Sequence, residues 1–216
     1  YSDYNFSYYL GWCLQPSTDY TVTISPGMAD PYGNLTTAGR TVNFRTARLE
    51  PLAYFNASGN VGTYNAYTET VLYLTTRNVE AVNLSLYRLP LQKFAEMTGP
   101  NSYDAVQNYR PQSSDLLRDW NVSVLHDLNQ TFLTKVLVAS DVGGALDPGV
   151  YYLVLRAPGL ADSYQLLVVS GANLTLKTSL TGALVWATDL NSGQPLANLP
   201  ITIYSQNFSR LAEGQT

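Results

Sequence analysis

Few residues in this chain are of types that do chemistry, and their spacing does not favour it. His126, followed by Asp127, is the only histidine. A Ser-His-Asp site also needs an activated serine, and the G-x-S-x-G elbow does not occur. A histidine metal site needs a second ligand of that kind, which a lone histidine cannot supply. We therefore expect His126 to be a solvated residue at a strand end, and we expect the chain not to be an enzyme.

The cysteine and the paired glycines of the chain also give no motif for a disulfide, a metal cluster or a phosphate-binding loop. Cys13 is the only cysteine, which excludes a disulfide within the chain and a cysteine-based metal cluster. The pair Gly143-Gly144 lacks the lysine and the following helix of a phosphate-binding loop. We therefore predict no catalytic residue, no cofactor-binding residue and no bound cofactor.

Two pairs of aspartates are candidate calcium ligands, since β-domain arrays often brace their linkers with calcium. They are Asp104 with Asp115 and Asp141 with Asp147. No D-x-[DN]-x-[DN]-G pattern accompanies them. Ordinary turns, in which an aspartate accepts backbone N–H groups, explain them better. We predict no metal site and keep calcium as the alternative.

Aromatic residues gather at the start of the chain: Tyr1, Tyr4, Phe6, Tyr8, Tyr9 and Trp12. They form either a sugar-stacking platform or a core strand. Residues 4, 6 and 8 would share one face of a strand, which favours the core. Trp120 and Trp186 lie within apolar alternation, and we predict that both are core anchors.

Eight asparagines begin an N-x-S/T triplet: Asn5, Asn34, Asn56, Asn83, Asn121, Asn129, Asn173 and Asn207. Such triplets are glycosylation acceptors in secreted proteins. Alternation in a strand also places Asn and Ser or Thr two residues apart on one solvated face. We favour the strand explanation, with glycosylation as the alternative.

The composition is that of a secreted β-protein. Seventeen tyrosines accompany only 13% charged residues and a net charge of -4. The aromatic and β-branched content suits half-buried strands, and the chain has no basic field for nucleic acid. Its apolar runs are far shorter than the roughly 20 residues of a membrane span. We expect a soluble segment without nucleic-acid partners.

Three blocks of strands follow from the alternation of apolar and polar residues. Residues 1–47 contain strands at Tyr20–Ile24 and Val42–Thr46, separated by a turn at Asp30–Asn34. A linker at 47–51 leads to the second block, residues 52–171. Residues 172–216 form the third, with a turn at Asn191–Pro195 and another beginning at Glu213-Gly214. We expect the first and last blocks to be incomplete domains, because two or three strands cannot close a sandwich.

The second block should be a complete sandwich of six or seven strands. Strands at Thr70–Thr76 and Ala81–Arg88 are predicted to form a hairpin. Pro90 should open a short helix at Leu91–Met97, which Gly99-Pro100 ends. Residues 101–114 are predicted to be a loop. Further predicted elements are a helix or strand entry at Leu116–Trp120 and strands at Val122–Leu125, Phe132–Ala139, Val150–Arg156 and Tyr164–Ser170.

The first block resembles the bacterial Ig-like domains of surface-layer and multidomain secreted proteins. Their final strands read L-x-P-x-T-x-Y-T-V, then a D-x-x-G-N turn, then F-x-T. The matching residues here are Leu14, Pro16, Tyr20–Val22, Asp30, Gly33, Asn34, Phe44 and Thr46. The match covers about 35 residues.

The end of the chain resembles bacterial α2-macroglobulin-like proteins. Leu184–Leu190, Ser192–Pro195 and Leu199–Tyr204 are similar to the family segment V-W-x-T-D-L-x-T-G-x-P-V-x-G-A-x-V-x-V-Y. Pro148-Gly149-Val150-Tyr151 resembles the P-G-x-Y strand that closes the preceding macroglobulin domain. Pro200 departs from the small residue common there. The resemblance is strong from Gly149 to Tyr204 and weak from Leu52 to Ser140.

This resemblance implies an all-β chain of tandem Ig-like and macroglobulin-type sandwiches. It also implies a secreted or surface protease trap, in which cleavage of a bait segment makes the molecule collapse around the protease. Many members add a thioester from a C-x-E-Q motif, but Trp12-Cys13-Leu14-Gln15 lacks its glutamate and spacing. We expect Cys13 to lie in an early strand instead.

The function that we predict is a non-catalytic structural segment of such a protease inhibitor. It would be extracellular, periplasmic or at the cell surface, and its partners would be neighbouring domains and, through the whole protein, proteases. The alternative is an Ig-like array of an adhesin or surface-layer protein. Nothing in the sequence supports an accessory module of an enzyme.

Overall fold

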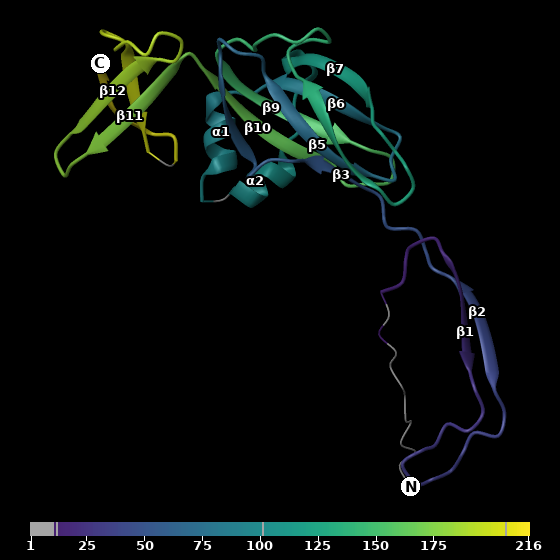
Figure 1. Cartoon of the computed structure of the whole chain (residues 1–216). Coiled ribbons are helices and arrows are strands. Elements are labelled where there is room, and N and C mark those ends of the chain that lie inside the picture. The colour runs from purple at the N-terminus through teal and green to yellow at the C-terminus, as the bar shows by residue number, and fades with distance from the viewer. Residues whose placement is uncertain (1–10, 12, 101, 206) are drawn as a thin grey trace. The chain divides into compact units, whose positions relative to one another are not determined.

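The computed structural model describes residues 11, 13–100, 102–205 and 207–216, and it shows an all-β protein with one helical insertion (Figure 1). The chain divides into two compact units, Tyr1–Glu50 and Pro51–Thr216. Their boundary falls within the linker predicted at residues 47–51. The further boundary near residue 171 stays a prediction. The aromatic cluster of Tyr1, Tyr4, Phe6, Tyr8, Tyr9 and Trp12 lies outside the described residues.

The first unit contains an antiparallel pair of strands, β1 (Asp19–Ile24) and β2 (Arg40–Arg45). Both lie where the sequence predicts strands. The turn between them is also confirmed, because the Asp30 carboxylate accepts the N–H groups of Tyr32 and Asn34, each at 2.8 Å. One prediction is wrong: Cys13 precedes β1 and lies outside any strand.

Two sheets form the sandwich in the second unit. The three-stranded sheet has the order β3-β5-β8, with the strands Leu52–Phe55, Val71–Arg77 and Thr131–Leu137. The five-stranded sheet has the order β4-β10-β9-β6-β7, with the strands Val61–Asn65, Ser163–Ser170, Gly149–Arg156, Ala81–Arg88 and Leu116–Ser123. All neighbours are antiparallel except β4 and β10, which are parallel.

The main core lies between these two sheets. Leu74 of β5, Leu84 of β6 and Leu153 of β9 are completely buried in one apolar cluster. Each apolar side chain removed from water stabilises the fold by about 1.5–3 kcal/mol. Trp120 of β7 packs against this cluster, which confirms its predicted place in the core.

The predicted hairpin of β5 and β6 does not form. Strand β5 pairs with β3 and β8, whereas β6 pairs with β7 and β9 in the other sheet. Both strands carry an apolar face, and each face is buried against the opposite sheet rather than beside its sequence neighbour. The turn between them, with Asn78 at a positive φ of 53°, therefore crosses from one sheet to the other.

Two short helices, α1 (Leu91–Thr98) and α2 (Ser102–Asn108), lie between β6 and β7 in the sequence. We call them the helical cover, because they lie over one side of β9 and β10 (Figure 1). Helix α1 confirms the sequence prediction. The predicted loop at 101–114 is wrong for its described residues, because α2 and a 3₁₀ turn at Ser113–Asp115 occupy most of 102–114.

The last part of the second unit contains two strand pairs. Strands β11 (Ala172–Thr178) and β12 (Ala183–Asp189) form one ribbon, and β13 (Pro200–Tyr204) and β14 (Arg210–Gln215) form another. Two predictions fail here. Trp186 is 55% exposed rather than a core anchor, because β12 pairs in its sheet with β11 alone and Trp186 belongs to neither apolar cluster of the described residues. Glu213 and Gly214 lie inside β14, not in a turn.

Candidate interaction pockets on the helical cover

The helical cover forms because its ends and its buried face are encoded locally. Pro90 precedes α1 with a φ of -58°, a conformation that starts a helix well. Its carbonyl accepts the N–H of Phe94 at 3.0 Å. Met97 and Tyr152 of β9 are buried in a second apolar cluster, which Phe94, Ala105 and others complete. The cover thus fixes the side chains of two short helices above the sheet.

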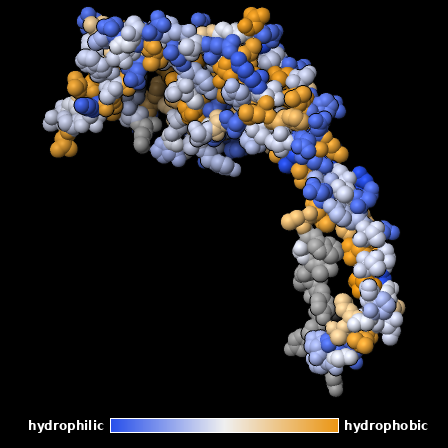
Figure 2. Space-filling view, in the orientation of Figure 1, coloured by the Kyte–Doolittle hydropathy of each residue, from blue (hydrophilic) through white to orange (hydrophobic). Residues whose placement is uncertain are grey.

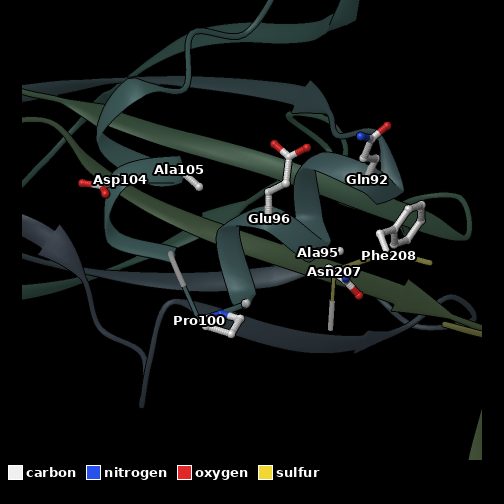
Figure 3. Close-up of a pocket in the computed structure, with 9 residues that line it drawn as sticks. Gln92, Ala95, Glu96, Pro100, Asp104, Ala105, Asn207 and Phe208 are labelled. Atoms are coloured by element: carbon white, nitrogen blue, oxygen red, sulfur yellow. The ribbon is translucent and has the colours of Figure 1, made fainter. Parts of the chain in front are cut away.

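One pocket has a volume of about 650 Å³ and lies between the two helices and the turn that joins β13 to β14. Figure 3 shows Phe208 of that turn beside α1, with Asp104 of α2 at the far end of the pocket. The Phe208 ring is stacked on Tyr204 at 4.5 Å. The lining is mixed: Ala95, Ala105, Pro100 and Phe208 are apolar, and Gln92, Glu96, Asp104 and Asn207 are polar.

A second pocket, of about 560 Å³, shares Glu96 and Asp104 with the first. It also contains Asp115, so the structure brings the predicted pair Asp104 and Asp115 to one surface. On the rim of this pocket, Lys93 forms an ion pair of 2.7 Å with Glu96. Among the residues that the structure describes, no three His, Cys, Asp or Glu side chains are grouped to hold a metal ion. These carboxylates can accept hydrogen bonds from a polar or basic partner.

A third pocket, of about 440 Å³, lies where α2 meets β9 and β10. Its base is the ring of Tyr152, which Tyr109 contacts edge-on at 5.0 Å and Tyr164 stacks on at 5.8 Å. Burial raises the pKa of Tyr152 to about 12, so its hydroxyl stays neutral at physiological pH. Arg156 and Asp162 form an ion pair of 3.2 Å at the rim. The pocket offers aromatic faces next to paired charges.

Beside this pocket, a polar network joins three strands on the same side of the sheet. Ser85 of β6 donates to Asp119 of β7 at 2.6 Å and accepts a hydrogen bond from Arg156 of β9 at 2.8 Å. Asn83 donates to the other oxygen of Asp119 at 3.0 Å. The Ser85 and Asn83 hydrogen bonds hold the pKa of Asp119 below its usual value. Sequence reasoning missed this network, although the Asn-x-Ser and Asp-x-Asn alternation signals a shared polar face.

The other candidates from the sequence stay apart from these pockets. His126 is exposed just after β7, with its Nδ1 at 3.1 Å from the carbonyl oxygen of Val124. Cys13 is exposed in the first unit. Asp141 forms an ion pair with Arg118. Gly143, with a φ of +91°, lies in a turn after Ala139, where a side chain would collide with Glu69. The structure therefore does not bring His126, Cys13 or Asp141 together with the pocket residues.

No family model and no curated protein matches this sequence, but its structure matches solved ones. A crystal structure of native alpha-2-macroglobulin from Escherichia coli, spanning domains MG0-NIE-MG1, matches 94% of the chain at a TM-score of 0.63 and 15% identity. A crystal structure of Salmonella alpha-2-macroglobulin reacted with methylamine matches 94% at a TM-score of 0.71 and 15% identity. The chain has a bacterial alpha-2-macroglobulin fold.

This alpha-2-macroglobulin fold was expected from the residues between Gly149 and Tyr204, and the structural match extends it to most of the chain. A second E. coli structure, spanning NIE-MG1, matches 77% of the chain at a TM-score of 0.54 and 14% identity. The chain spans 66% of the three-domain structure and 12% of the Salmonella protein. No helix in the described ranges has the length and apolar content to cross a membrane.

Proposed function

We propose that this chain is a non-catalytic structural segment of an alpha-2-macroglobulin-like protease inhibitor that acts outside the cytoplasm. The observation that supports this is the match of 94% of the chain to one continuous three-domain stretch of the E. coli protein. The role proposed for the segment is to hold neighbouring domains in place. Proteases would be partners of the whole protein.

The comparisons also support a three-part division of the chain. The matched share falls from 94% to 77% when the E. coli structure lacks MG0, and the second unit, Pro51–Thr216, is the part that would remain. In the proposed division, residues 1–47 are the C-terminal part of a bacterial Ig-like domain. Residues 52–171 form a macroglobulin-type sandwich, and residues 172–216 begin a second macroglobulin-type domain.

The inhibitor role is tested with the natural gene product that contains this chain. The purified protein is mixed with an endoprotease, and cleavage of a large protein substrate is compared with cleavage of a small peptide. A trap blocks access of large substrates only, so we expect protein cleavage to fall while peptide cleavage continues. Equal loss of both activities, or loss of neither, contradicts the proposal.

The structural role is tested separately with the isolated 216-residue chain. We expect it neither to inhibit the protease nor to cleave either substrate. Inhibition by the chain alone would show that this segment carries a reactive site of its own. A natural reading frame that ends near Thr216 would also contradict the proposal, since no downstream domains would exist.

A further inference from the structure

A single glycine connects the sandwich to the ribbon that follows it. Strand β10 ends at Ser170 and β11 begins at Ala172, so only Gly171 separates them. The Ser170 hydroxyl donates to the carbonyl of Ala172 at 2.7 Å and accepts its N–H at 3.0 Å. Glycine has the widest backbone freedom of any residue. Without other contacts, this position would act as a hinge.

Tyr67 lies against this glycine. It belongs to the turn after β4, where the side chain of Asn65 accepts its N–H at 2.9 Å. A Cβ added at Gly171 would lie 3.1 Å from the hydroxyl oxygen of Tyr67 and 3.3 Å from Cζ. Both distances are shorter than ordinary carbon contacts. The absence of a side chain at Gly171 therefore allows the Tyr67 ring to lie close to the backbone between β10 and β11.

The hydroxyl of Tyr67 reaches the end of the ribbon beside this connection, where Ala172 pairs with the last residue of β12. It donates to Oδ2 of Asp189, the last residue of β12, at 2.6 Å. The other carboxylate oxygen accepts the N–H groups of Asn191 and Ser192 at 3.1 and 2.8 Å, and the Ser192 hydroxyl at 2.8 Å. The N–H of Leu190 donates to the carbonyl of Gly171 at 2.8 Å. Both oxygens of Asp189 thus have partners from different segments.

We propose that Tyr67, Gly171 and Asp189 form a brace that holds the sandwich and the β11–β12 ribbon as one rigid body. The brace joins the turn after β4 to the end of β12, 122 residues further along the chain. It acts at Gly171, together with the backbone hydrogen bond from Leu190 and the contacts of Ser170. This inference does not depend on the proposed inhibitor function, because it concerns only the orientation of two parts of the second unit.

The hydrogen bond of the brace is maintained over a wide pH range. The Tyr67 hydroxyl, followed by the Ser192 contacts, lowers the pKa of Asp189 to about 2. The same carboxylate raises the pKa of Tyr67. The acceptor is therefore charged and the donor is protonated at neutral pH. A hydrogen bond to a charged acceptor is stronger than one between neutral groups.

The test measures residual dipolar couplings of backbone amides in the full chain. In the unmodified protein, the sandwich and the ribbon are expected to share one alignment tensor. Tyr67→Phe keeps the ring but removes the hydroxyl, and we expect the alignment of the ribbon to fall at least twofold relative to the sandwich. Tyr54→Phe, on an exposed tyrosine of β3, is the matched control and should change nothing. An unchanged ribbon in Tyr67→Phe, or separate tensors in the unmodified protein, overturns the proposal.

A second variant tests the same brace without removing the hydrogen-bonding groups. Gly171→Val should push the Tyr67 ring off the connection and produce the same loss of alignment. Because both variants disrupt the same brace, the double variant should show no further loss of ribbon alignment. Unchanged amide shifts in β9 would show that the sandwich remains folded. A ribbon that stays aligned in Gly171→Val contradicts the role of the glycine.

Discussion

Two strands of the second unit, β9 and β11, differ in apolar content and in environment: six of eight residues are apolar in β9 (GVYYLVLR), against three of seven in β11 (ANLTLKT). Every residue of β9 from Val150 to Leu155 has an exposed fraction of 8% or less. In β11, Leu174 and Leu176 are more than half exposed, at 55% and 53%. The burial of a strand therefore depends both on how many of its residues are apolar and on what covers its two faces.

Strand β9 is buried because it has neighbours on every side. It pairs with β10 and β6, the three-stranded sheet covers one face, and the helical cover lies over the other. Strand β11 pairs with β12 alone in the described structure. Figure 2 shows apolar residues on the surface at the tip of this ribbon, where Leu180 is fully exposed.

The sharpest test of this contrast is Leu153→Ala set against Leu174→Ala. Leu153 is completely buried in the main core, so its truncation should lower the free energy of unfolding by about 3–5 kcal/mol. Leu174→Ala should change it by less than about 0.5 kcal/mol, because its side chain is already in water. Urea unfolding measures both. Equal losses would show that the ribbon is covered in solution.

The second prediction concerns a truncation that weakens the helical cover and leaves the side chains of the main core unchanged. Met97 of α1 is 5% exposed in the cluster between the cover and the sheet. Met97→Ala should cost about 2 kcal/mol. Hydrogen exchange should speed up in α1 and α2 while the amides of β5 and β6 remain protected. If exchange rises equally in all four elements, the helical cover and the main core unfold together. The two faces of β9 would then not be independently stabilised.

A smaller effect is expected from a polar group inside the sandwich. Gln165 of β10 is 1% exposed, and its Nε2 atom has no hydrogen-bond partner in the described part of the chain. Gln165→Met has nearly the same shape and removes the buried donor, so it should raise the free energy of unfolding by about 1 kcal/mol. Thermal unfolding by calorimetry measures this gain. A loss of stability would mean that the amide is satisfied in solution.

The smallest effect concerns the polar network on the rim of the sheet. The pKa of Asp119 is lower in the folded chain than in the unfolded chain, where its usual value is 3.8. Its contribution to stability is therefore present above about pH 4 and disappears as the pH falls through the folded pKa. The difference in Tm between the unmodified protein and Asp119→Asn should shrink below pH 4. Ser85→Ala should weaken this pH dependence, and a constant difference would contradict it.

The sequence predicted strands best where apolar and polar residues alternate, as in β1 and β6, and where an apolar run is bounded by turn residues, as in β9 and β10. It missed β3 and β4, because both are short and β4 contains Gly62 and Asn65, which are poor strand formers. It also missed α2, whose polar sequence is helical because Ala105 and Val106 pack on the sheet. Strand pairing could not be predicted, since alternation identifies a face but not the sheet that covers it.

The candidate sites show the same limit. The turns at Asp30 and Gly143 were predictable, because they depend on residues close in the sequence. The brace at Tyr67 and Asp189 was not, since its members are 122 residues apart. The segment that ends in Asp189 was noticed for its alternation and for its family resemblance, and neither indicates a contact with Tyr67. The structure gives it a physical role, because the carboxylate of Asp189 is shared between a local turn and a distant tyrosine.

The parallel pairing of β4 with β10 has a consequence for how the chain folds. Val61 lies opposite Leu166, so the five-stranded sheet cannot close until nearly all of the sandwich has been synthesised. Contacts between such distant residues slow folding, because a long loop must close before they form. We expect the emerging chain to expose the edge of β4 for most of its synthesis. Until β10 is available, this edge can pair with the wrong strand.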